Sequence, residues 1–190
     1  MIHGMEDVID LNIPVDRNQL NAVRFNWHKY HPSKPIDRYA CSITSIDGED
    51  DPGINFEPLH PYNLQHGSKY TEMSFNKPTI HAKPFHNLLI NFDVGRSHYL
   101  RLPPGGYFPW HRDADPTSYR LIYTISGCQP QSLVWILDDR VLQLNDNSWY
   151  YINTRKKHCL FSYDTATFAV FNIANDERNQ RTLYQHMATK

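Results

Sequence analysis

Cysteine is scarce in this sequence, which contains three among its 190 residues. Cys41, Cys128 and Cys159 are an odd number at no metal-like spacing, which argues against a disulfide framework. The first residues also lack the basic and then apolar pattern of a secretory signal. We therefore expect a reducing, cytoplasmic setting.

An excess of one charge and long apolar runs are missing as well. The sequence has 19 basic and 20 acidic residues and a formal net charge of −1, which argues against general binding to nucleic acid or to anionic membranes. No apolar run approaches the roughly 18 residues that a membrane helix needs. Neither nucleic acid nor a membrane is expected as a partner.

Turn-forming and aromatic residues are abundant instead, with 13 Pro, 8 Gly and 13% aromatic residues. This composition favours a compact protein rich in strands and turns over a helical bundle or a disordered chain. The length predicts a single domain over 1–190. Within it we expect N-terminal helix and strand support with a long loop at 1–92, a core at 93–175 and a C-terminal tail at 176–190.

The first part of the chain predicts a short strand and a helix. Residues 8–13 alternate apolar and polar side chains, which indicates an edge strand. Asp16 is followed three residues later by Gln19, which is capping-box spacing. Apolar residues then recur at helical intervals, so a helix is predicted over about 17–30, ended by Pro32.

The following segments are less regular. Residues 38–46 predict a strand, which an Asp-Gly turn signal follows. Residues 49–83 show no sustained period and predict a long loop, a candidate cover for a functional site. A short helix is expected from Pro84 onward.

Beyond residue 91 the pattern changes to short apolar runs separated by turn residues. Strands are expected near 97–102, 107–111, 119–125, 132–137, 140–144, 149–152, 157–163 and 167–173. Eight strands in two sheets form a jelly roll, so the fold class is predicted as mainly β, jelly roll, with flanking N-terminal helices.

The strongest functional signal lies in the stretch 103–113. His111 and Asp113 are two apart on an extended segment, so their side chains point to the same side and can bind one metal ion together. His158, at the head of a later strand, is placed to supply a third ligand. Two imidazoles and one carboxylate that leave three positions open form the ligand set of non-haem Fe(II) oxygenases. We expect the other histidines to be structural or exposed.

The residues around these ligands resemble a known family. The stretch Leu102 to Ile125, with Pro-Gly, His111-Arg112-Asp113 and Tyr119-Arg120-Leu121-Ile122-Tyr123, followed by His158, looks like the Fe(II)/2-oxoglutarate-dependent dioxygenases. Within them it looks most like the aspartyl/asparaginyl β-hydroxylase-like branch, which includes free-proline hydroxylases. The resemblance covers roughly 84–175.

The resemblance implies a double-stranded β-helix, or cupin-like, core that uses Fe(II), 2-oxoglutarate and O₂ and releases succinate and CO₂. His111, Asp113 and His158 match the family's metal ligands. Arg120 matches a basic position that helps to hold the cosubstrate or an acidic substrate. The implied function is hydroxylation of an amino acid or of a peptide or protein side chain, so a small-molecule or peptide substrate is the expected partner.

One position departs from the family. The family usually has an arginine on the last core strand that pairs with the distal carboxylate of 2-oxoglutarate. The corresponding window 165–170 holds no cation. Because a buried carboxylate without a partner is costly, another cation must serve, and Arg120 and Arg101 are the candidates. Tyr123 and Trp135 are candidates for lining a substrate pocket.

Two other functions stay open at this point. The missing arginine would fit a cupin-like metal enzyme that does not use 2-oxoglutarate. A non-catalytic β-sandwich would instead use its aromatic surface and the loop 49–83 to bind a partner. Metal content that survives replacement of His111 by alanine would favour the binding protein over both enzymes.

Overall fold

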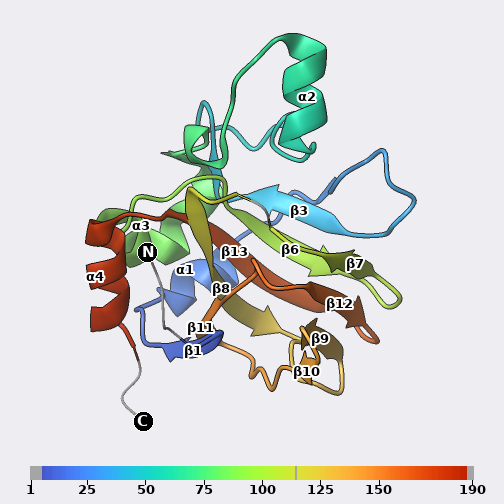
Figure 1. The fold of residues 1–190 in the computed structure, drawn as a ribbon, viewed down its shortest axis with the longest axis vertical. Coiled ribbons are helices and arrows are strands. Elements are labelled where there is room, and N and C mark those ends of the chain that lie inside the picture. The colour runs from blue at the N-terminus through green and yellow to red at the C-terminus, as the bar shows by residue number, and fades with distance from the viewer. Residues whose placement is uncertain (1–5, 114, 188–190) are drawn as a thin grey trace.

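The computed structural model describes residues 6–113 and 115–187 (Figure 1). Most of the regular structure is β. The strands are β1 (Val8–Leu11), β2 (His28–Lys29), β3 (Tyr39–Ser42), β4 (Thr44–Ser45), β5 (Lys77–Pro78), β6 (His98–Leu102), β7 (Tyr107–His111), β8 (Ser118–Ser126), β9 (Leu133–Leu137), β10 (Arg140–Val141), β11 (Ser148–Ile152), β12 (His158–Ser162) and β13 (Ala166–Ala174). The helical elements are α1 (Arg17–Ala22), α2 (Leu59–His66), η1 (Glu72–Ser74), η2 (Ile80–Phe85), α3 (His86–Asn91) and α4 (Glu177–Gln185).

The strands β6 to β13 pass back and forth between two sheets, except that β9 and β10 are neighbours in the small one. The large sheet has the order β1-β11-β8-β13-β6-β3-β2, and the small sheet has the order β10-β9-β12-β7. Neighbouring strands are antiparallel. Two facing antiparallel sheets that take strands in turn form a double-stranded β-helix, so the predicted jelly-roll fold class is confirmed.

All eight predicted core strands are present with ends close to those expected. The strand predicted at 8–13 is also present, because β1 pairs with β11 at one edge of the large sheet. The prediction over 38–46 corresponds to two strands, β3 and β4, and β4 pairs with β5 in a separate small sheet.

Apolar side chains form two layers. The inner core lies between the two sheets and includes Leu100, Ile122, Leu160 and Phe168. The outer core lies between the large sheet and the helices, and it includes Leu20, Phe85, Tyr99, Tyr123, Phe171 and Leu183. Figure 1 shows α1, α3 and α4 on this outer face, whereas α2 extends away from the sheets. Alternation along each strand decides which layer a side chain joins.

Polar side chains fix the ends of the helices. The Asp16 carboxylate accepts a hydrogen bond from the Gln19 backbone N–H at 3.0 Å and so caps α1. The Asp176 carboxylate caps α4 in the same way through the Asn179 N–H at 2.8 Å. None of the helices in 6–113 and 115–187 is long and apolar enough to cross a membrane.

The helix predicted over 17–30 is wrong beyond its first turns. Helix α1 ends at Ala22, and Val23 already has an extended backbone. Phe25 and Trp27 stack on each other at 4.8 Å, and Phe25 meets the Tyr99 ring edge-on at 4.9 Å. Packing these two aromatic rings against the large sheet replaces the helical continuation that their spacing had suggested.

The long loop predicted at 49–83 is also wrong in part, since this segment contains α2, η1, β5 and η2. Its role as a cover stays a prediction, although Pro58, Leu59 and Glu72 from it line the cavity described below. The divisions expected at 92/93 and 175/176 also stay predictions. Residues 1–5 and 188–190 of the two outer segments lie outside the described residues.

Candidate metal centre

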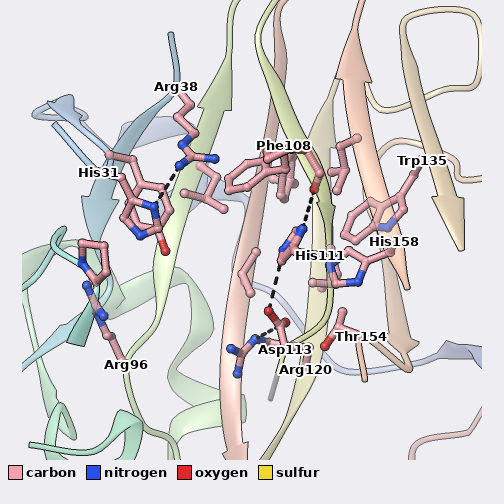
Figure 2. Close-up of a pocket in the computed structure, with 18 of the residues that line it drawn as sticks. His31, Arg38, Arg96, Phe108, His111, Asp113, Arg120, Trp135, Thr154 and His158 are labelled. Atoms are coloured by element: carbon pink, nitrogen blue, oxygen red, sulfur yellow. Dashed lines mark hydrogen bonds and ion pairs between the residues drawn. The ribbon is translucent and has the colours of Figure 1, made fainter. Parts of the chain in front are cut away.

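The pairing of β7 with β12 brings the three predicted ligands together. His111 ends β7, His158 begins β12, and the two residues are direct partners across the ladder. Asp113 follows just beyond β7, where its backbone N–H donates to the Thr154 carbonyl oxygen at 2.9 Å. One donor atom from each of the three side chains lies within 4.8 Å of the others, and Figure 2 shows them converging. Such spacing allows all three to bind one ion.

Both imidazoles are oriented by backbone carbonyls. The His111 Nδ1 atom lies 2.7 Å from the Pro109 carbonyl oxygen, and the His158 Nδ1 atom lies 3.0 Å from that of Lys156. Because a carbonyl oxygen only accepts, each Nδ1 carries a proton, and this tautomer directs the Nε2 atom of each ring toward the other ligands. A hydrogen bond of this kind is typical of metal-ligating histidine, so the ring geometry fits a metal site.

The two oxygen atoms of the Asp113 carboxylate contact different neighbours. Its Oδ2 atom lies 3.2 Å from Arg120 Nε, and its Oδ1 atom lies 3.7 Å from His111 Nε2. Burial acts to raise the pKa of this carboxyl, but the charges of Arg120 and then His158 outweigh it and hold the pKa below its usual value. The carboxylate is therefore ionised at neutral pH, with Oδ1 facing the imidazoles.

The His158 ring is buried, with 3% of the residue exposed. Burial lowers the pKa of this imidazole below its usual value; the hydrogen bond to the Lys156 carbonyl opposes the effect, and His111 reinforces it. The ring is thus neutral at pH 7, which is the form that binds a metal ion.

A cavity of about 400 Å³ opens beside the three ligands. Part of its wall comes from the inner core, including Leu100, Ile122, Leu160 and Phe168. Trp135 stands next to the ligands, with its ring centroid 6.5 Å from that of His158. Three arginines also line the cavity, Arg38, Arg96 and Arg120. The cavity therefore combines an apolar wall with buried positive charge, which suits an anionic ligand.

Arg38 was not expected at the site, because it lies in the N-terminal support outside the core strands. It is 4% exposed, and its guanidinium carbon lies 4.4 Å from the Phe108 ring centroid. One of its nitrogens lies 2.8 Å from His31 Nδ1, while its Nε has no hydrogen-bond partner among the described residues. Within that same part of the chain, no carboxylate pairs with it.

Arg96 was missed as well, but its surroundings differ. Its guanidinium donates to the backbone carbonyl oxygens of Ile54, Asn55 and Glu57 at 2.6–3.1 Å. The Glu72 carboxylate lies 3.9 Å away. Arg96 is therefore held by the protein itself, whereas Arg38 is left for another partner.

Comparisons with known proteins locate similar folds. No protein-family model and no curated protein matches the sequence. Among solved structures, a 2OG-Fe(II) oxygenase family oxidoreductase from Burkholderia pseudomallei aligns with a TM-score of 0.47 and 13% identity, over 84% of this chain and 77% of that chain. A cupin-2 domain containing protein from Shewanella frigidimarina aligns with a TM-score of 0.32 and 16% identity, over 40% of this chain and 67% of that chain. These likenesses concern the fold alone.

Two predicted site residues lie elsewhere. Arg101 follows Leu100, which lines the cavity, and therefore points to the other face of β6, where its guanidinium lies 5.9 Å from the Trp27 ring centroid. Tyr123 follows Ile122 in the same way and joins the outer core. The structure therefore places neither beside the predicted ligands, whereas Arg120 and Trp135 do line the cavity.

Proposed function

We propose that the protein is an Fe(II)- and 2-oxoglutarate-dependent oxygenase that hydroxylates an amino acid or a peptide side chain. The observation that carries this proposal is the set of free donor atoms at one corner of the cavity, two Nε2 atoms and Asp113 Oδ1. Two imidazoles and one carboxylate leave three positions of an octahedral ion open. With O₂ and the 2-oxo acid, bound iron would supply the oxidant for a C–H bond.

The protein's own residues have distinct tasks in this proposal. His111, His158 and Asp113 would hold the ion, and the two backbone carbonyls keep their imidazoles in the ligating orientation. Arg120 pairs with Asp113 Oδ2 and so keeps the carboxylate ionised and fixed. Trp135 and Phe168 line the cavity and would limit the access of water and orient the substrate.

Arg38 would anchor the distal carboxylate of 2-oxoglutarate. The usual final-strand position is apolar here, since Phe168 of β13 lines that part of the cavity. The Phe108 ring lies near both Arg38 and the metal corner, because its centroid is 4.4 Å from the guanidinium carbon and 6.2 Å from the His111 ring centroid. A buried guanidinium without a carboxylate partner favours an anion at this place. A five-carbon dicarboxylate would thus bridge the ion and Arg38.

The proposal is tested by turnover and by ligand binding together. Purified protein incubated with Fe(II), O₂ and 2-oxoglutarate is expected to form succinate slowly even without its substrate, and to bind 2-oxoglutarate under anaerobic conditions. A His111→Ala variant is expected to lose both, whereas His66→Ala, which changes an exposed histidine of α2, keeps both. Wild-type protein that neither forms succinate nor binds 2-oxoglutarate would contradict the proposal.

A second candidate is a cupin-like metal enzyme that does not use 2-oxoglutarate. The observation that favours it is Phe168 in place of the cation usual on the last core strand. It predicts metal-dependent conversion of a small molecule in the absence of any 2-oxo acid. In that case metal binding would still depend on His111, but Arg38→Met would not change the affinity for 2-oxoglutarate.

A further inference from the structure

A second group of metal-binding side chains lies on the other side of the large sheet. It consists of Cys41 on β3, Asp50 after β4 and His81 on η2, whose donor atoms lie within 4.8 Å of one another. His28 on β2 is close by. None of these four lines the cavity. Cys41 belongs to the outer core, while its neighbour Ala40 belongs to the inner core, so the two groups are separate.

We propose that Cys41, Asp50 and His81 form a structural Zn²⁺ site, with His28 beside Asp50 but hydrogen-bonded to the Asn26 side chain. The contacts converge on one atom, Asp50 Oδ2. Cys41 Sγ lies 3.6 Å from it, His81 Nε2 lies 3.4 Å from it, and His28 Nε2 lies 3.6 Å from it. The inference does not depend on the proposed oxygenase activity.

These separations match the edges of a tetrahedral zinc site. Zinc binds sulfur at about 2.3 Å and imidazole nitrogen or carboxylate oxygen at about 2.0–2.2 Å, which puts sulfur and oxygen about 3.6 Å apart, and nitrogen and oxygen about 3.4 Å apart. The contacts of Cys41 and His81 with Asp50 have these values. A thiolate with an imidazole and a carboxylate is a ligand set that selects zinc among common divalent ions.

The charges of the group also favour a divalent cation. The Asp50 side chain is 8% exposed, its Oδ1 accepts from the Ser42 backbone N–H at 2.6 Å, and no lysine or arginine of the described residues pairs with it. One thiolate and one carboxylate balance the charge of Zn²⁺, and the His81 imidazole supplies the third donor. Burial and then the Asp50 charge raise the pKa of the Cys41 thiol, so zinc would displace its proton to solvent as the Zn–S bond forms.

The position of the group indicates a structural role. Its members come from β3, η2 and the segment after β4, which lie between residues 39 and 85. The segment after β4 continues to the carbonyl oxygens that Arg96 contacts and to the cavity wall at Pro58 and Leu59. An ion bound to Asp50 would therefore fasten this wall to the large sheet.

The test measures zinc and cobalt binding in chelator-treated protein. Wild-type protein is expected to bind two equivalents of zinc, one at each group. His111→Ala is expected to retain the equivalent at Cys41, whereas Cys41→Ser binds that equivalent at least a hundredfold more weakly and keeps only the one at the first centre. Co²⁺ bound at this site is expected to show a thiolate charge-transfer absorption, which the first centre cannot produce because it contains no cysteine. Cys128→Ser is the matched control, since this second buried thiol lies outside the group.

His81→Gln gives a second variant that leaves the buried sulfur in place, and it is expected to weaken zinc binding to a similar extent. Circular dichroism of the metal-free variants shows whether they are folded. Two results would overturn the inference. One is zinc binding by Cys41→Ser and His81→Gln that equals that of Cys128→Ser. The other is a cobalt complex of wild-type protein without a thiolate band.

Discussion

Arg38 is the residue on which cosubstrate binding depends in this proposal. Replacing it with methionine is expected to weaken 2-oxoglutarate binding by about 10- to 100-fold, because a charge-assisted hydrogen bond contributes about 1.5–3 kcal/mol. Metal affinity is expected to stay unchanged. Titration calorimetry with 2-oxoglutarate and a redox-inert ion at the first centre measures both. Arg101→Met, which changes an arginine on the other face of β6, is the control.

The same variant has a second readout in the free protein. Since Arg38 is buried without a carboxylate partner among the described residues, its removal is expected to leave the thermal stability of the ligand-free protein equal or higher. An unchanged affinity for 2-oxoglutarate together with a raised KM for the substrate would show that Arg38 binds the substrate and not the cosubstrate. If neither the affinity for 2-oxoglutarate nor the KM for the substrate changed, Arg38 would have no part in binding either molecule.

The contrast between Arg38 and Arg120 shows what residue spacing can reveal. Arg120 was predicted because it lies on a core strand near the His-x-Asp sequence, and alternation along β8 places it in the cavity. The same alternation excludes Tyr123 and Arg101, whose neighbours Ile122 and Leu100 face inward. Arg38 comes from outside the core strands, so no pattern in the sequence relates it to the ligands. Arg38 comes close to the ligands only because β3, which begins at the next residue, pairs with β6 in the folded protein.

At the scale of elements, the segment after β4 is fixed by one arginine. Arg96→Met removes hydrogen bonds to the carbonyl oxygens of Ile54, Asn55 and Glu57, and we expect a loss of about 2–4 kcal/mol in the free energy of unfolding. New protease cleavage within 49–58 is also expected. Urea unfolding and limited proteolysis measure these two effects.

Arg178→Met is the matched control for this prediction. Arg178 also pairs with a carboxylate, that of Asp93, but its side chain is 60% exposed. An exposed ion pair contributes about 0–1 kcal/mol, so this variant is expected to remain close to wild type. Equal stability of the two variants would show that the contacts of Arg96 do not fix the segment.

Regular elements were predictable where local sequence decides them. The eight core strands follow from short apolar runs between turn residues, and capping by Asp16 marks the start of α1. The helix predicted over 17–30 failed because Phe25 and Trp27 pack on the sheet, which is a tertiary effect. The cysteines gave no metal-like spacing for a similar reason, since Cys41, Asp50 and His81 meet only after folding.

At the scale of the whole molecule, buried histidines make stability depend on pH. Burial, then the charges of Arg38, Arg96, Lys34 and His111, lower the pKa of His31 to about 3. The unfolded chain therefore binds more protons than the folded protein below pH 6.5, and stability falls as the pH drops from about 6.5 toward 3. For His31 alone the loss at pH 5 is about 2 kcal/mol relative to pH 7.

Urea unfolding of metal-free protein at pH 7 and pH 5 tests this dependence. His31→Asn keeps a hydrogen-bond acceptor and tolerates the positive φ of 52° at this position. The stability difference between the two pH values is expected to shrink by about 2 kcal/mol in this variant. His66→Asn is expected to keep the wild-type difference. Identical pH profiles for His31→Asn and wild type would contradict the prediction.

The direct pairing of His111 with His158 has a consequence for the identity of the bound ion. Because the β7–β12 ladder sets the spacing of the two imidazoles, the first centre has its donors in place before any ion arrives. Binding of an ion then requires no rearrangement of the sheet. Manganese, cobalt, nickel or zinc could therefore bind at the same three ligands, because nitrogen and oxygen donors bind all of these divalent ions and do not select iron. The metal found in a preparation would therefore reflect the growth medium and the purification history.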